Sequence, residues 1–199
     1  MIEKGKVSQE PFIEILKTLE EAESSNLVDW NAMNIASVDQ SNQPSSRMVL
    51  LKKISDEGLV FYTNYNSRKG KEIELNPKVA VNFWWRELKK QIRVEGLIEK
   101  ASKEDSDNYF NSRPLKSRVS AIISNQSSII PSYEDLTKQI DNYLDHNDKS
   151  SIKRPDHCGL YIVIPNAVEF WHEQDNRTHQ RLKYILEDSQ KWSSHLLSP

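Results

Sequence analysis

Residues 46–70, SRMVLLKKISDEGLVFYTNYNSRKG, decide the fold class of this chain. Two apolar runs, 49–51 and 59–62, flank a turn that contains Gly58. Because glycine can take the positive φ that such a turn needs, the stretch predicts a β-hairpin. Ser67 has the short hydroxyl side chain typical of a helix N-cap, so a helix is expected to follow it. The stretch thus predicts strand, turn, strand and helix in direct succession.

Cations crowd both ends of this hairpin, with Arg47 and Lys52 on its first strand and Arg68 and Lys69 just after Ser67. The first turn of a helix is a poor place for positive charge, because the helix N-terminus is already positive. A docked anion would resolve the conflict, since free N–H groups and the dipole both favour phosphate. A solvated basic turn explains the same residues, and this stretch alone leaves both interpretations open.

The rest of the chain is predicted to be mainly β with peripheral helices. Strands are expected at 31–38, 79–85, 91–98, 160–164, 167–171 and 181–185, and helices from Pro11 onwards and over 67–75, 102–110, 115–123 and 132–143. The run VAVNFWW (79–85) is so continuously β-branched and aromatic that a fully buried central strand is expected. Six or so strands joined by short turns favour an antiparallel sheet curled into a barrel. Residues 1–30 are expected to form a loose tail (1–7) and one helix, and 31–199 a single domain.

Composition excludes several classes of protein. The chain has 199 residues with 27 basic against 29 acidic side chains, so a general nucleic-acid binder is not expected. No apolar run approaches the roughly 20 residues of a membrane span, and no apolar signal core begins the chain. The single cysteine, Cys158, fits a reducing cytoplasm. Five glycines are too scattered for a Rossmann fingerprint or a P-loop.

Two further basic clusters accompany the hairpin. One contains Arg113, Lys116 and Arg118, and the other contains Arg177, His179 and Arg181. Spacing of i, i+2, i+4 on an extended chain predicts that the last three side chains share one face. Like charges on one strand face repel unless an anion or a carboxylate lies among them. Each cluster alone is typical of a solvated edge, whereas three clusters beside aromatic residues favour ligand binding.

Other chemistries are less well supported. His157, Cys158, His172 and His179 lack regular ligand spacing, so no metal site is predicted. A nucleophile elbow of the GxSxG type is absent from the sequence. A basic groove with aromatic residues on a small barrel is also compatible with single-stranded nucleic acid, and composition alone leaves that interpretation open.

Taken together, the motifs resemble the pyridoxamine 5′-phosphate oxidase family. The matching pieces, in the family's order, are NAMNIASVD (31–39), SRMVLLK (46–52), VFYTNYNSRKG (60–70), QIRVEG (91–96), YFNSRPLKS (109–117), SNQSS (124–128), EFW (169–171) and RTHQR (177–181). The resemblance implies a split β-barrel and a homodimer with FMN at the subunit interface. It also implies oxidation of pyridoxamine or pyridoxine 5′-phosphate to pyridoxal 5′-phosphate, with O₂ as electron acceptor and hydrogen peroxide as product.

The resemblance also assigns roles to residues by position. The implied FMN contacts are Arg47, Met48, Val49, Leu50, Leu51, Lys52, Tyr62, Thr63, Arg68, Lys69, Gln91, Gln126, Ser127, Trp171 and Arg181. The implied substrate contacts are Lys52, Tyr109, Arg113, Ser117, Arg177, Thr178 and His179. Of these, Arg177 and His179 would cover the pyridine ring and are the implied catalytic residues.

The chain departs from the family pattern at three places. Cys158-Gly159-Leu160 stands where the family usually has Trp-Gly-Gly, and Leu196 stands in place of an arginine near the end. Gln180 replaces an aspartate between Arg177 and Arg181, which is expected to weaken the positioning of both arginines. These departures leave two alternatives open. One is a related flavin oxidoreductase of the phenazine type on the same barrel, and the other is a flavin- or pyridoxal phosphate-binding protein without turnover.

Overall fold

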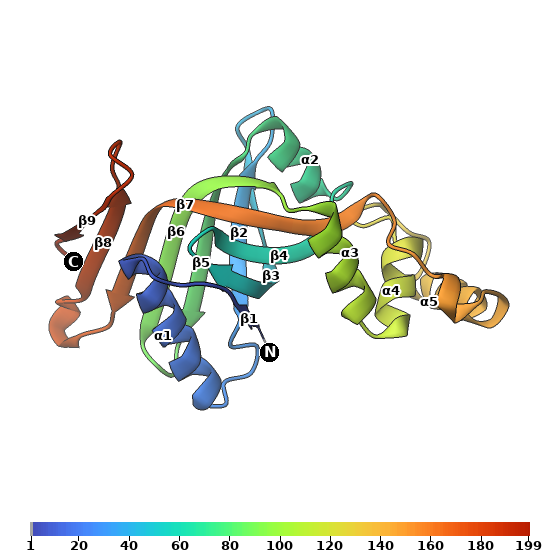
Figure 1. Ribbon diagram of the computed structural model, residues 1–199, viewed down its shortest axis with the longest axis horizontal. Helices are drawn as coiled ribbons and strands as arrows, with labels where there is room; N and C mark the ends of the chain where they lie inside the picture. Colours follow the sequence, from blue (N-terminus) through green and yellow to red (C-terminus); the bar gives the residue numbers. More distant parts are fainter. Residues whose placement is uncertain (1) are drawn as a thin grey trace.

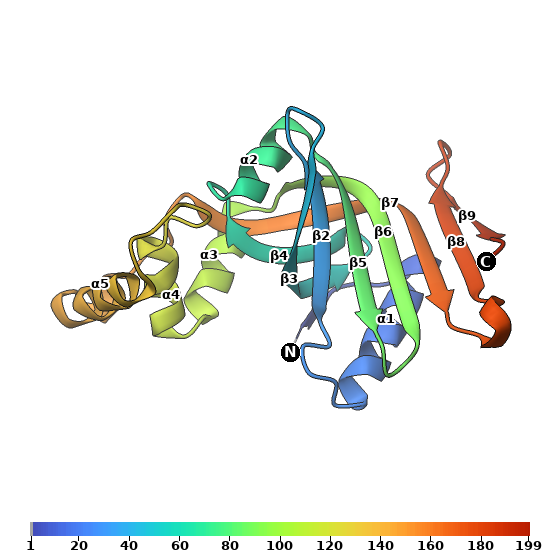
Figure 2. The same ribbon diagram turned by 180° about the vertical axis from the view of Figure 1, so that it is seen from behind.

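The computed structural model, which describes residues 2–199, is built on a closed six-stranded barrel (Figures 1 and 2). Its strands are β2 (Ala32–Val38), β3 (Pro44–Ser55), β4 (Gly58–Asn64), β5 (Lys78–Trp85), β6 (Lys90–Lys100) and β7 (Cys158–His172). Each strand pairs antiparallel with the next in the order β3-β2-β5-β6-β7-β4, and β4 pairs back onto β3. This closure confirms the predicted split-barrel class.

The hairpin of residues 46–70 forms as predicted. Gly58 begins β4 with φ +146°, and Ser67 caps the helix α2 (Arg68–Leu75) by accepting a bond from the Gly70 amide. The β-branched and aromatic side chains of the strands point alternately into the barrel, where Leu51, Phe61 and Val94 are fully buried. Burial of such side chains contributes most of the favourable free energy of folding.

The prediction for residues 79–85 was partly wrong. β5 does lie between β2 and β6, in the middle of the sheet. Its side chains nevertheless alternate between buried and exposed, and Trp84 is 47% exposed. Continuous aromatic composition therefore did not mean burial on both faces, and Trp84 lies on the outer face of the barrel.

The two strands predicted at 160–164 and 167–171 are one strand, β7. Its first part pairs with β4 and its last part with β8 (Gln180–Leu186), while β6 follows it along most of its length. Pro165 lies between the two predicted segments, opposite Gly96 at a register shift, where a missing N–H is tolerated. β7 thus leaves the barrel and carries β8 and β9 (Trp192–Leu196) with it.

Two short strands were not predicted. β9 pairs with β8, and β1 (Glu3–Lys4) pairs parallel with β3, so the expectation of a loose tail was wrong for these residues; position 1 lies outside the described residues. The polar composition of SSHL around residues 193–196 gave no strand signal. Trp192 anchors this end of the sheet, because its ring packs edge-on against Phe12 at 6.2 Å.

The helices lie around the barrel on different sides (Figure 1). α1 (Glu10–Ser24) buries Phe12, Ile15 and Leu19 in the barrel core. α3 (Lys103–Ser112), α4 (Leu115–Ile123) and α5 (Tyr133–His146) extend on the side opposite β8 and β9 and enclose a smaller apolar cluster around Phe110 and Val119. Ser102 and Ser132 cap α3 and α5 as predicted, each accepting from the amide three residues on. Within residues 2–199, no helix is both long and apolar enough to cross a membrane.

Candidate functional site

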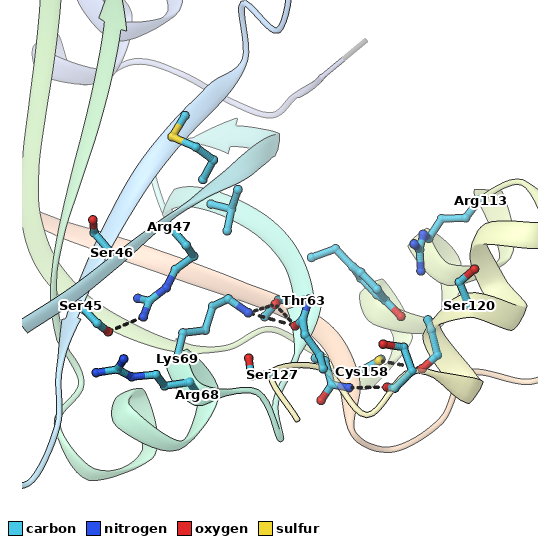
Figure 3. Close-up of a pocket in the computed structure, with 17 residues that line it drawn as sticks. Ser45, Ser46, Arg47, Thr63, Arg68, Lys69, Arg113, Ser120, Ser127 and Cys158 are labelled. Atoms are coloured by element: carbon cyan, nitrogen blue, oxygen red, sulfur yellow. Dashed lines mark hydrogen bonds between the residues drawn. The ribbon is translucent and has the colours of Figure 1, made fainter. Parts of the chain in front are cut away.

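A pocket of about 670 Å³ lies where β3 and β4 meet α2, α4 and the loop that follows α4 (Figure 3). Predicted site residues that line it are Arg47, Met48, Val49, Tyr62, Thr63, Arg68, Lys69, Arg113, Gln126 and Ser127. Figure 3 shows Arg47, Arg68 and Lys69 on one side and Arg113 with Ser120 on the other. The fold therefore brings Arg47, Arg68 and Lys69 of the first basic cluster and Arg113 of the second together across one cavity.

Lys69 is the most unusual group in this pocket. Lys69 is only 6% exposed. Its ammonium group donates hydrogen bonds to Thr63 Oγ1 at 2.6 Å, Ser67 Oγ at 2.8 Å and Gln126 Oε1 at 3.1 Å. Among residues 2–199 no carboxylate forms an ion pair with it. Burial and the positive charge of Arg47 lower the pKa of Lys69 to about 8. A buried cation with only neutral partners is costly unless an anion joins it.

A buried carboxylate organises the neighbouring arginines. Glu72 accepts from Arg47 Nη2 at 3.1 Å, from Arg68 Nε at 2.8 Å and from the hydroxyls of Ser37 and Ser45. Burial alone would raise the pKa of Glu72, but the hydroxyl and guanidinium donors outweigh burial and lower it to about 2. Glu72 was not among the predicted residues, although its i, i+4 spacing from Arg68 was a usable signal.

Glu72 also offsets part of the unfavourable positive charge at the N-terminus of α2. Arg68, in the first turn, is neutralised by its own helix through Glu72. Its side chain is 57% exposed, and its two terminal nitrogens make no hydrogen bond within the described part of the chain. Arg68 therefore keeps a free fork of N–H groups at the pocket, a shape suited to phosphate oxygens.

Two polar atoms at the far side of the pocket are buried without partners. The Tyr62 hydroxyl and Arg113 Nη1 make no hydrogen bond to any described residue, and the Arg113 guanidinium lies 4.8 Å from the centre of the Tyr62 ring. Buried polar atoms are almost always paired in native proteins. A bound ligand that forms hydrogen bonds with these two atoms would explain why they have no partner in the protein.

A second group of predicted residues lies on the outer face of the sheet. Gln91 pairs in register with Trp84 on one side and with Trp171 on the other, and Trp171 pairs with Arg181. Directly opposed residues share a face, so these side chains form one row across β5, β6, β7 and β8. Leu50 and Met48 project outward from β3, being 41% and 60% exposed.

Arg177, Thr178 and His179 lie beyond the end of this row. The extended geometry predicted for Arg177, His179 and Arg181 was wrong at Arg177, whereas Arg181 lies in β8. Asn176 and Arg177 belong to a short 3₁₀ turn, Asp175–Arg177, and have φ of 55° and 61°. The His179 ring packs against Trp171 at a tilt, with ring centres 4.6 Å apart, and its Nδ1 accepts from the Gln174 amide at 3.2 Å. Arg177, Thr178 and Gln180 are exposed. Strained backbone in a non-glycine residue is often found at functional sites.

The residues expected to bind the substrate phosphate do not all line one pocket. Lys52 and Tyr109 line a neighbouring pocket of about 640 Å³, with the Lys52 ammonium 5.8 Å from the Tyr109 ring centre. Tyr62 lines the first pocket and Tyr109 the second, and their rings lie 5.0 Å apart. Ser117 is half-buried on α4, one turn before Ser120. Leu51 points into the barrel core and lines neither pocket.

Cys158, which replaces a family tryptophan, also lines the first pocket. Burial raises the pKa of its thiol, so it is a neutral wall of the cavity. Within residues 2–199, no three His, Cys, Asp or Glu side chains are grouped so that they could hold a metal ion.

The pKa of Lys69 gives a prediction for stability. The ordinary value is 10.5 and the folded value about 8, so between these pH values the unfolded chain holds a proton that the folded chain has lost. The free energy of unfolding should therefore rise with pH across this window through Lys69. Lys69→Met should remove that rise in urea unfolding measured at several pH values, and Lys71→Met, an exposed neighbour on α2, should keep it. Equal pH slopes in the wild type and Lys69→Met would contradict the assignment.

The sequence of this chain matches two protein-family models. The family model "Pyridoxamine 5′-phosphate oxidase" matches residues 19–146, and the model "Pyridoxine 5′-phosphate oxidase C-terminal dimerisation region" matches residues 159–199. A protein from Nostoc sp. named pyridoxine/pyridoxamine 5′-phosphate oxidase is 46% identical over 97% of this chain and 90% of its own length. The chain belongs to the pyridoxine/pyridoxamine 5′-phosphate oxidase family.

Relatives from other organisms have the same name. One from Hydrogenovibrio crunogenus is 41% identical over the whole of this chain and 92% of its own length. These relatives are named as oxidases, and the expectation that this chain is an oxidoreductase enzyme is confirmed. The match of residues 159–199 to a dimerisation region supports a homodimer.

Solved structures agree with the fold. PhzG from Burkholderia lata, solved in complex with tetrahydrophenazine-1-carboxylic acid, superimposes with a TM-score of 0.90 at 26% identity over 96% of this chain and 94% of its own. A pyridoxamine 5′-phosphate oxidase-related, FMN-binding protein from Nostoc punctiforme gives 0.78 at 16% identity over 97% and 100%. The second likeness shows the fold alone.

Proposed function

We propose that this protein is an FMN-dependent oxidase that converts pyridoxamine or pyridoxine 5′-phosphate to pyridoxal 5′-phosphate. The observation that carries the proposal is buried Lys69, without an ion-pair partner, in a basic pocket of a chain from this family. A pocket of about 670 Å³ is of the size that proteins use for cofactors.

The residues present fit FMN. Its phosphate would lie against Arg47, Arg68 and Lys69, with Ser127 and Gln126 beside them, because the free fork of Arg68 and the buried ammonium both need an anion. Met48, Val49, Tyr62 and Thr63 would line the ring system, and the unpartnered Tyr62 hydroxyl would gain a partner there. Two phosphate-bearing ligands also explain how a chain with nearly balanced charge keeps several basic clusters.

A homodimer with FMN at the subunit interface completes this proposal. Gln91, Trp171 and Arg181 lie on the outer sheet face and line no part of the pocket that contains Lys69. They would therefore serve the pocket of a second copy of the chain. The dimerisation match over residues 159–199 covers Trp171 and Arg181 and supports this division.

When bound, FMN would supply the redox chemistry, accepting a hydride from the substrate carbon and passing the electrons to O₂ to give hydrogen peroxide. The chain's own residues bind and orient the substrate. Arg113, with its unpartnered Nη1, would take the substrate phosphate, helped by Lys52, Tyr109 and Ser117. Arg177 and His179 would cover the pyridine ring.

The imidazole of His179 is held in one orientation. Its Nδ1 accepts the Gln174 amide, so Nε2 is left to carry a proton and donate towards a ligand. The cations around the site would stabilise negative charge that develops during electron transfer. A cytoplasmic location belongs to the proposal and is supported by the single, buried Cys158 thiol.

Peroxide release tests this function. FMN-loaded protein should release hydrogen peroxide when pyridoxamine 5′-phosphate is added in air, and should respond far less to pyridoxamine, which lacks the phosphate that Arg113 would bind. Pyridoxine 5′-phosphate in a third arm measures the preference between amine and alcohol. Binding of FMN without peroxide from either phosphorylated substrate would contradict the proposal. Oxidation of tetrahydrophenazine-1-carboxylic acid, the compound bound in the PhzG structure, would instead favour a phenazine-type activity.

A further inference from the structure

Arg181 is held in place by groups of its own chain. Its Nε donates to Glu169 Oε1 at 2.8 Å and its Nη2 to Glu169 Oε2 at 3.2 Å, which makes a two-pronged ion pair. Its Nη1 donates to the backbone oxygen of Ser198 at 2.9 Å. Because a guanidinium carries five N–H groups, these three bonds leave donors free for a ligand.

Glu169 is a buried carboxylate on the outer face of β7, and its side chain is only 8% exposed. It also pairs with Arg93, its cross-strand neighbour on β6. Burial alone would raise the pKa of Glu169, but the hydrogen bonds from Arg181 and Arg93 outweigh burial and hold it below its usual value. The carboxylate is therefore charged at neutral pH and binds two arginines at once.

Glu169 can do more than neutralise the positive charge of Arg181. An arginine side chain has many rotamers, and fixing it before a ligand arrives lowers the entropy cost of binding. The two-pronged pair fixes the plane of the Arg181 guanidinium, which a single contact cannot do. Position 180, where the family usually has an aspartate, carries the exposed Gln180, and the Gln180 side chain makes no hydrogen bond to Arg181 among the described residues.

We propose that Glu169 is a positioning residue of the cofactor site, because its carboxylate fixes Arg181 in the orientation in which it reaches the flavin. The inference rests on the proposed function, since it assigns Arg181 to an FMN site. On this proposal, the placement of Arg181 does not depend on the carboxylate that is missing at Gln180. The anchoring carboxylate comes from the neighbouring strand β7.

A double-mutant cycle tests this role with the full-length protein. The FMN dissociation constant is measured by quenching of flavin fluorescence for the wild type, Glu169→Gln, Arg181→Gln and the double variant. Glu169→Gln should weaken FMN binding about tenfold in the wild type and less than about twofold when Arg181 is already Gln, because coupled residues are not additive. Glu95→Gln, which changes an exposed carboxylate on the same face of β6, should leave the affinity within about twofold.

The remaining outcomes are decisive. Equal weakening by Glu169→Gln in both backgrounds would show action through Arg93 or the fold and would overturn the inference. An unchanged FMN affinity accompanied by a lower melting temperature would overturn it too, because it would show a structural role only. Failure of the wild type to bind FMN would instead refute the proposed function, and the inference with it.

Discussion

Arg177→Ala is expected to reduce turnover of pyridoxamine 5′-phosphate by about 100-fold, roughly 2.7 kcal/mol in the activation free energy, while FMN content stays near that of the wild type. Arg177 is exposed and makes no hydrogen bond or ion pair within the described part of the chain, so its charge is available to a substrate. It also lies outside the pocket that contains Lys69. Loss of its side chain should therefore affect the reaction without affecting retention of the cofactor.

The backbone conformation at position 177 should not contribute to the effect of Arg177→Ala. Arg177 has φ 61°, a conformation that costs arginine and alanine alike. The melting temperature of Arg177→Ala should therefore stay close to that of the wild type. Lys191→Ala, which removes an exposed cation after β8, serves as the control for loss of one positive charge. The assigned role would be refuted by equal losses of turnover and bound FMN.

Lys69→Met is expected to weaken FMN binding by about 100-fold, or roughly 2.7 kcal/mol. The substitution keeps the length of the side chain and removes its charge. Hydrogen bonds to charged groups contribute about 1.5–3 kcal/mol each, and Lys69 is buried where screening by solvent is weak. Riboflavin, which lacks the phosphate, should bind both proteins within about threefold of each other.

The comparison of the two flavins separates a phosphate contact from a damaged pocket. If Lys69→Met distorts the cavity, both flavins should bind less well. Lys71→Met, on the exposed side of the same helix, should change neither affinity. The assignment of Lys69 to the phosphate would be wrong if the ratio of the two affinities stayed the same in Lys69→Met.

Local patterns in the sequence predicted the barrel hairpins and helix caps well. Gly58 and Ser67 act through their immediate neighbours, and so their effect is visible in a short stretch. The division of β7 into two strands, 160–164 and 167–171, was wrong, because the pairing that carries the strand through Pro165 is formed with Gly96 of β6, far away in the sequence. The exposure of Trp84 was missed for a related reason, since which face of a strand is covered depends on the whole sheet.

The site was predicted mainly through the family resemblance. Motifs gave the residue types, while the structure shows which of them meet: Arg47, Lys69 and Arg113 share one pocket, and Lys52 lies in the next. The carboxylates that organise the arginines were missed. Glu169 finds its partners across β-strands, and only folding brings Arg93 and Arg181 to it.

The central claim is that this chain binds FMN and uses it to oxidise pyridoxamine 5′-phosphate or pyridoxine 5′-phosphate. The visible spectrum of FMN-loaded protein, recorded without oxygen as pyridoxamine 5′-phosphate is added, tests that claim most directly. The account predicts that the flavin absorption bands bleach and return when air is admitted. A protein that remains colourless after addition of FMN, or flavin bands that stay unchanged with the substrate, would contradict it.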